Sequence, residues 1–199
     1  IAMTVVVFGG ASNLFSFATI QGDRSLQLEA PVATPWVWAT VLGIPGSEIH
    51  QNYVLATREV AGPGAHLAGD VVGLLMPIAF VIIVLLLWRA RRLAVRQGRL
   101  TTGLEQRLIL VASFALTAAL IVFNKVGSPQ YMLWLAPIVA VGLIVDPQAW
   151  RKAAGWLAGV CFATTLVFPV LYMPLIDGDP FSAGVLLARN VMVVGLFVW

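Results

Sequence analysis

The stretch that decides the fold class is VVGLLMPIAFVIIVLLLW, residues 71–88, which contains no charged side chain. A helix needs about 20 mostly apolar residues to cross the hydrocarbon core of a bilayer. Because backbone amides within lipid must bond inside their own segment, such a stretch forms a helix rather than a strand. The sequence therefore predicts a membrane-spanning helix over 70–88.

Composition extends this prediction to the whole chain of 199 residues. Hydrophobic residues make up 60% and charged residues 11%, against about 25% charged residues in an ordinary soluble domain, which excludes a soluble globular enzyme. Six spans are predicted, at 1–20, 70–88, 107–124, 129–145, 156–175 and 183–199. We therefore expect an all-α, polytopic bundle of transmembrane helices that forms one domain over 1–199.

The two ends of the chain and its single cysteine add two expectations. The chain begins at Ile1 and closes at Trp199 inside an apolar run, which favours the later half of a longer membrane protein, so that the remaining half would be a partner. Since Cys161 is the one cysteine, the chain forms no internal disulfide and no zinc site built on thiolates.

Charge placement predicts which ends of the helices face the cytoplasm. Residues 89–107 include six arginines and one acid, Glu105, and basic loops mark the cytoplasmic side of a membrane. Nucleic-acid binding is the less favoured interpretation, because this block lies between two apolar runs. By alternation, 146–155 lies inside, and 21–69, 125–128 and 176–182 lie outside a plasma membrane.

The external loop region, 21–69, is expected to hold short elements of its own. Residues 35–44 (PWVWATVLGI) are apolar but too few to cross a bilayer, which predicts a re-entrant or interfacial segment. An alternative interpretation makes 26–44 a full span with Glu29 inside it. Residues 47–60 (SEIHQNYVLATREV) predict a short surface strand or an irregular loop.

Polar residues of differing chemistry gather at the external boundary, most informatively in FNKVGSPQYMLWLAP, residues 123–137. Gly127 is predicted to end one helix in the left-handed conformation, while Ser128 and Pro129 suit the N-cap and first position of the next. The positive end of that helix, together with Lys125, favours an anion such as a lipid phosphate. The alternative interpretation is a tight turn whose polar residues only cap and snorkel.

A second group of candidates lies in DRSLQLEAPVATP, residues 23–35. Arg24 can bind a phosphate through two parallel hydrogen bonds. Glu29 can bind sugar hydroxyls or act as a base. The alternative interpretation is a solvated loop with an incidental pair of opposite charges.

Arg189 lies about 9 Å inside the last predicted span. An intramembrane charge indicates a function and a partner, so we expect it to pair with Asp177 or Asp179 or to face a phosphate, unless it snorkels to the outer interface. Two carboxylates without a third ligand do not indicate a metal site. His50 and His66 are expected to be surface residues.

The stretch NKVGSPQYMLWLAP, residues 124–137, resembles the NKV-x-SPQY-x-x-W-x-x-P signature of polytopic bacterial glycosyltransferases of the GT-C superfamily. RSLQLE, residues 24–29, is similar to their external RG-x-Q-x-ES motif, with Ser25 where glycine is usual and Ala30 where serine is usual. The likeness covers most of 20–140. The group that it resembles best is the family-87-like mannosyltransferases that depend on polyprenol phosphate mannose.

What this resemblance implies is transfer of a sugar, expected to be mannose, from a polyprenyl-phosphate donor to a glycan or glycolipid acceptor at the external face, with inversion. Positive groups would stabilise the departing phosphate and polar groups would hold the sugar. The implied phosphate binders are Arg24, Lys125 and the amide of Ser128, with Arg189 as a weaker fourth, and the implied sugar binders are Gln27, Glu29, Gln130 and Tyr131. The resemblance implies no cofactor, metal or nucleic acid.

The catalytic base is left unassigned. In the family, this acid follows the first span, so a later-half fragment would lack it and be inactive alone; Glu29 and Asp23 are weak substitutes. The competing class is a transporter or flippase for a lipid-linked or anionic substrate. Transporters place polar groups near the bilayer midplane, whereas here these groups crowd one boundary, which favours an interfacial enzyme.

Overall fold

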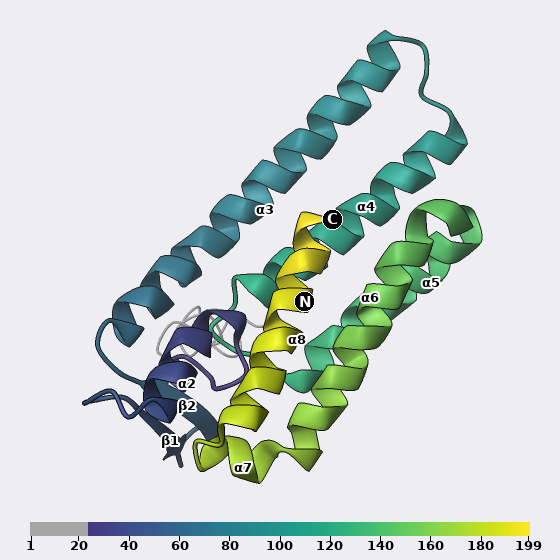
Figure 1. Ribbon diagram of the computed structural model, residues 1–199. Helices are drawn as coiled ribbons and strands as arrows, with labels where there is room; N and C mark the ends of the chain where they lie inside the picture. Colours follow the sequence, from purple (N-terminus) through teal and green to yellow (C-terminus); the bar gives the residue numbers. More distant parts are fainter. Residues whose placement is uncertain (1–23) are drawn as a thin grey trace, which may run out of the picture.

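The computed structural model describes residues 24–199, so the predicted span 1–20 and Asp23 lie outside the described residues. The described chain is mostly helical (Figure 1). Its elements, in order, are η1 (Pro31–Ala33), α2 (Thr34–Val41), β1 (Glu48–Asn52), β2 (Thr57–Ala61), α3 (Ala65–Arg96), α4 (Thr102–Val122), η2 (Pro129–Trp134), α5 (Leu135–Val145), α6 (Pro147–Thr165), η3 (Leu166–Val170), α7 (Tyr172–Ile176) and α8 (Pro180–Val198).

Within residues 24–199, four helical stretches are long and apolar enough to cross a membrane. They are Ala65–Arg96, Thr102–Val122, Pro147–Val170 and Pro180–Val198. Their lengths and compositions indicate a membrane protein, which agrees with the composition of the chain. The predicted number of six spans is not reached in the described part of the chain.

One predicted span, 129–145, is a shorter apolar helix of mixed type. Its first part, η2, is a 3₁₀-helix, which rises faster along its axis than the α-helix that follows it as α5. With ordinary rises the two parts together extend about 28 Å, just below the roughly 30 Å of a hydrocarbon core. The predicted span is therefore present as an apolar helix over 129–145, but its first part is a 3₁₀-helix and the whole is shorter than the four spanning helices.

The two loops predicted on the cytoplasmic side, 89–107 and 146–155, are much shorter in the structure than these ranges. α3 continues to Arg96 and α4 starts at Thr102, where the Thr101 hydroxyl accepts a hydrogen bond from the Leu104 amide at 3.2 Å. Likewise, Asp146 caps α6 by accepting from the Ala149 amide at 3.1 Å. Most of the basic residues of 89–107 therefore lie within α3 and α4, because a helix can continue past the apolar run that crosses the membrane.

The two ends of the bundle differ in the elements that they carry (Figure 1). The turns that join α3 to α4 and α5 to α6 lie toward one end, where Arg107 forms an ion pair with Asp146 at 3.2 Å. The hairpin of β1 and β2, helix α2 and helix α7 lie at the other end. This grouping agrees with the alternation expected from the sequence.

The predicted loop region 21–69 is folded over its described part. β1 and β2 pair antiparallel, with Glu48 opposite Ala61 and Asn52 opposite Thr57. Of the two alternatives for 47–60, a strand and an irregular loop, the strand is the one found, and it forms one half of a hairpin. The alternative of a full span over 26–44 is wrong, since α2 has eight residues and extends only about 12 Å. Its buried Val37 packs in a second core beside α8 residues Ala183 and Leu186.

Two apolar cores hold the described residues together. The larger one lies among α4, α5, α6 and α8 and includes Trp150, whose ring packs edge to face against Phe114 with the ring centroids 5.5 Å apart. The smaller one lies beneath 24–41 and includes Leu26 and Leu28. Because the chain from 24 to 30 is anchored by this second core, its polar side chains are held at the same end of the bundle as the hairpin.

Candidate functional site

Residues 24–30 lie between β2 and the segment that joins α4 to η2. The Leu28 amide donates to the Arg58 carbonyl at 3.0 Å, and the Val60 amide donates to the Leu26 carbonyl at 2.9 Å. On the other side, the Gln27 amide donates to the Lys125 carbonyl at 3.0 Å. The two stretches that carry the family resemblance are thus hydrogen-bonded to each other, although they are about 100 positions apart.

Gly127 is needed at this junction, but not for the reason expected. Its backbone is not left-handed, and α4 has already ended at Val122. A Cβ at position 127 would overlap the backbone of Glu29 and Ala30, while the Gly127 amide donates to Gln27 Oε1 at 3.1 Å. The predicted left-handed helix end is therefore wrong, and the glycine allows two backbones to pack in contact.

Ser128 and Pro129 occupy the predicted positions at the start of a helix, although this helix, η2, is a 3₁₀-helix. Pro129 occupies the first turn of η2 and Ser128 its N-cap position, but the Ser128 side chain makes no capping hydrogen bond. Its hydroxyl is therefore not used to cap the helix.

A cleft of about 570 Å³, here called the first cleft, opens at this junction. It brings together most of the candidates named from the sequence: Arg24, Gln27, Glu29, Ser128, Gln130 and Tyr131. Sequence reasoning missed the other polar residues on its wall, which are Gln51, Thr57, Arg58 and Tyr172. Arg58 and Tyr172 come from β2 and α7, which are distant in the sequence, so only the fold could assign them to this cleft.

Glu29 is the carboxyl group on the wall of the first cleft, and it is 8% exposed. Burial raises the pKa of Glu29 above its usual value, against the opposing effects of a backbone hydrogen bond, the charge of Arg189 and a hydrogen bond with Tyr172. Burial likewise raises the pKa of the Tyr172 hydroxyl, which the charge of Glu29 raises further. The pair can present a proton or accept one at the surface of the cleft.

Arg189 does not face the first cleft, nor does it pair with Asp177 or Asp179. It is 1% exposed, and its Nη1 donates to the Glu29 carbonyl at 2.7 Å and to Asn190 Oδ1 at 2.6 Å. Asp179 instead caps α8 by accepting from the Ser182 amide at 2.8 Å. The expectation of a partner is met by backbone and amide oxygens, because the chain at Glu29 folds over this turn of α8.

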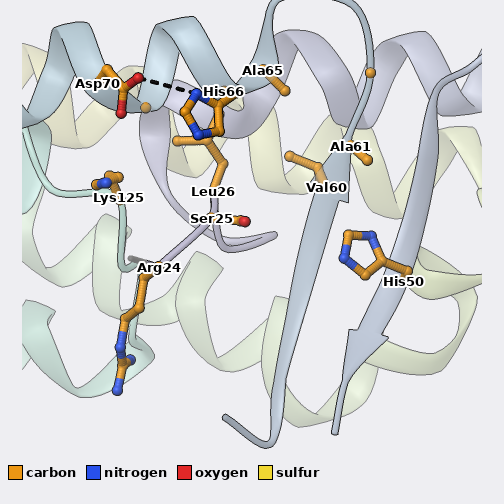
Figure 2. Close-up of a pocket in the computed structure, with 12 residues that line it drawn as sticks. Arg24, Ser25, Leu26, His50, Val60, Ala61, Ala65, His66, Asp70 and Lys125 are labelled. Carbon is orange, nitrogen blue, oxygen red and sulfur yellow. Dashed lines mark ion pairs between the residues drawn. The ribbon is translucent and has the colours of Figure 1, made fainter. Parts of the chain in front are cut away.

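Lys125 lines a different cavity, here called the second cleft, of about 470 Å³ (Figure 2). His66 lines it from the start of α3, and its Nδ1 pairs with Asp70 at 3.1 Å. His50 lies on the opposite wall, from β1. The structure therefore separates Lys125 from Gln130 and Tyr131 and places both histidines in one cavity.

Arg24 lines both clefts. Its Nε is buried and finds no hydrogen-bond partner among the described residues. Within residues 24–199 no group of three or more histidine, cysteine or acidic side chains could hold a metal ion. The chemistry that these walls offer is hydrogen bonding, positive charge and, in the first cleft, the carboxyl group of Glu29.

In comparisons with family models, curated proteins and solved structures, nothing matched the chain. The functional argument consequently rests on the residues of the two clefts and on the two sequence stretches that meet there.

Proposed function

We propose that the chain is part of a membrane glycosyltransferase of GT-C type, which transfers a sugar, expected to be mannose, from a polyprenyl-phosphate donor to a glycan or glycolipid acceptor. The observation that carries this proposal is the composition of the first cleft. It combines two guanidinium groups, one buried carboxyl group and several amide and hydroxyl groups at one end of an apolar helix bundle. A sugar joined to a lipid phosphate needs this combination.

The reaction proposed for this cleft forms one bond and breaks one bond. The acceptor hydroxyl attacks the anomeric carbon, the bond from that carbon to the phosphate oxygen breaks, and polyprenyl phosphate leaves with the electron pair. Arg24 and Arg58 stabilise the negative charge on the departing phosphate, helped by the backbone amide of Ser128.

The remaining polar residues of the first cleft bind the sugar. Glu29, Gln27, Gln130 and Tyr131 supply donors and acceptors for its hydroxyl groups. The proton of the acceptor goes to a carboxylate, for which Glu29 and Asp23 are the candidates within this chain. Lys125 lies in the second cleft, so in this proposal it does not contact the donor phosphate.

The proposed setting is a plasma membrane with the first cleft on the external side. The basic helix ends around Arg91 and Arg107 lie toward the opposite end of the bundle, and basic ends favour the cytoplasm. A lipid-linked donor in the outer leaflet would then meet the cleft at the level of its own headgroup.

The test is sugar transfer in membranes that contain the natural protein, with synthetic polyprenyl phosphate [¹⁴C]mannose as the donor. Arg24→Gln and Arg58→Gln are each expected to slow transfer about a hundredfold or more, since each removes a charge that stabilises the leaving phosphate. Arg151→Gln, at the exposed start of α6, is the matched control and should keep the full rate.

Wild-type transfer that persists in both cleft variants would contradict the assignment of the phosphate site. Movement of the intact lipid-linked sugar across the membrane without transfer would instead support the transporter class.

A further inference from the structure

Three arginines near the end of α3 share one face of this helix. Arg89, Arg92 and Arg96 follow one another at spacings of three and four residues, which places them in one row along an α-helix. All three are exposed. The buried Ala94 lies two positions from both Arg92 and Arg96, which is about 160° around the helix axis. This basic row therefore points away from α4, beside which α3 stands at the edge of the bundle (Figure 1).

The arginines on the two faces of α3 differ in their partners. Arg91, at the same level of the helix, forms an ion pair with Glu105 of α4, with Nη2 3.0 Å from Oε1. Within residues 24–199, no acidic side chain forms an ion pair with any arginine of the basic row. Arg92 lies over the ring of Trp88, with Cζ 4.5 Å from the ring centroid, a contact that orients the guanidinium without neutralising it. The outward face therefore carries three positive charges.

The basic row continues an apolar strip on the same face of α3. Ile78, Ile82 and Leu85 precede Arg89 at the same spacings of four and three residues, and these apolar side chains are between 45% and 54% exposed. Trp88 lies at the level where the strip ends and the row begins, and tryptophan prefers the boundary between hydrocarbon and headgroups. A ligand on this face would meet apolar surface and then, within one helical turn, positive charge.

The positions of the arginines along the helix axis match the headgroup layer of a membrane. Arg89 and Arg92 follow Trp88 by about 1.5 Å and 6 Å at the ordinary rise of an α-helix. A headgroup layer is about 5–7 Å thick on each side of a bilayer, so both arginines fall within it. Arg96 lies about 12 Å beyond Trp88, but helical side chains tilt toward the N-terminus, which brings its guanidinium back toward this layer.

We propose that the basic row binds the headgroup of an anionic membrane phospholipid, with the acyl chains of that lipid lying along Ile78, Ile82 and Leu85. The recognised chemistry is a net negative headgroup joined to long apolar chains. A nucleic acid would match the charge of the row but not the apolar strip. The site is independent of the proposed sugar transfer, because the basic row and the first cleft lie toward opposite ends of the bundle.

The test is native mass spectrometry of the natural protein in detergent, which counts bound molecules and gives their dissociation constants. Dioleoylphosphatidylglycerol carries both recognised features. Dioleoylphosphatidylcholine has the same acyl chains without the net charge, and glycerophosphoglycerol is the anionic headgroup without the chains. Phosphatidylglycerol should bind about tenfold more tightly than either of the others, since each arginine near an anionic surface contributes up to about fivefold.

Each comparison can contradict one part of the proposal. Equal affinities for the two lipids would overturn the role of the arginines, and equal affinities for phosphatidylglycerol and glycerophosphoglycerol would overturn the role of the apolar strip. A single-stranded DNA oligonucleotide that binds more tightly than phosphatidylglycerol would assign the basic row to a nucleic acid instead.

Matched variants locate the site on α3. With all three arginines of the basic row changed to glutamine, the two lipids should bind equally, and Arg92→Gln alone should weaken phosphatidylglycerol about fivefold. Because these side chains are exposed, thermal unfolding should be unchanged. Arg91→Gln is the control, since it removes the same charge at the same level on the side of α4. A preference for phosphatidylglycerol that persists in the triple variant, or is lost equally in Arg91→Gln, would exclude the basic row.

Discussion

Arg189 Nη1 lies 2.7 Å from the carbonyl oxygen of Glu29, a residue 160 positions earlier in the chain. The neighbouring Asn190 extends this link, since its Nδ2 donates to the Thr34 hydroxyl at 2.8 Å. The last helix therefore holds the wall of the first cleft through hydrogen bonds to residues 29 and 34. Arg189 acts on the cleft through the backbone that it holds rather than by touching a ligand.

Replacing Arg189 by methionine should destabilise the fold by about 3 kcal/mol, because it leaves the Glu29 carbonyl and the Asn190 amide oxygen buried without a donor. The free energy of unfolding in detergent measures this effect. Arg99→Met, at an exposed position between α3 and α4, should change that free energy by less than about 0.5 kcal/mol. Equal effects of the two variants would show that the hydrogen bonds of Arg189 contribute nothing to the free energy of unfolding.

Gly127→Ala should destabilise the protein by about 2 kcal/mol or prevent folding, since the added methyl group would overlap the backbone of Glu29 and Ala30. Gly155→Ala is the matched control within α6, where an added Cβ meets nothing within 4 Å. That variant should be neutral or more stable by up to about 1 kcal/mol, because alanine favours a helix. Thermal unfolding of both variants in the same detergent compares them, and a fully stable Gly127→Ala would contradict the close packing.

The raised pKa of Glu29 predicts how stability depends on pH. Burial raises this pKa from 4.5, so the folded chain holds the proton more tightly than the unfolded chain. The stabilising contribution is complete below about pH 4.5 and is lost as the pH rises through the folded pKa. Wild type should therefore lose unfolding free energy relative to Glu29→Gln over that window, and a difference that is flat from pH 4 upward would contradict the burial.

Tyr172→Phe should raise the pKa of Glu29 further, because the Tyr172 hydroxyl bonds to the charged form of the carboxyl group and lowers that pKa. Infrared titration of the carboxyl band, with Glu29→Gln as the spectral blank, measures the shift. A downward shift would mean that the hydroxyl does not donate to Glu29.

Sidedness can be tested by labelling single cysteines in intact cells. With Cys161 replaced by serine, Gln130→Cys is expected to react with an impermeant maleimide from outside, and Gln97→Cys is not; both positions are exposed. The two residues lie at opposite ends of the bundle, Gln130 in the first turn of η2 and Gln97 directly after α3. Labelling of Gln97→Cys but not of Gln130→Cys would show that the chain lies in the membrane with the opposite orientation.

The sequence predicted the four long apolar helices of residues 24–199, and the strand as one of two alternatives for 47–60, because these elements depend on local pattern. The run over 71–88 needs only its own composition to be recognised as a membrane helix. The ends of these helices were misplaced, since Thr101 and Asp146 cap helices that already include several charged residues. An apolar run sets the minimum length of a helix, whereas the capping residues mark where the helix begins or ends.

The site was predicted only where its residues share a short stretch. Arg24, Gln27 and Glu29, and likewise Ser128, Gln130 and Tyr131, appear as local motifs, and the fold brings the two groups together. Arg58 and Tyr172 reach the cleft from elements whose own sequences carry no such signal. The role of Gly127 was mistaken for the same reason, because its contact with Glu29 is a long-range one.

The backbone pairing of residues 26–28 has a consequence for how this protein can vary. Leu26 and Leu28 are at most 2% exposed and enter the apolar core, while Gln27 and Glu29 between and after them line the first cleft. Residues 26–28 pair with 58–60, and the Ala30 amide closes a turn by donating to the Gln27 carbonyl at 3.0 Å, so deleting or inserting one residue here would shift the core and cleft side chains out of these positions. The number of residues between Arg24 and Ala30 is therefore as strictly constrained as their identities, and variation in length must fall outside this segment.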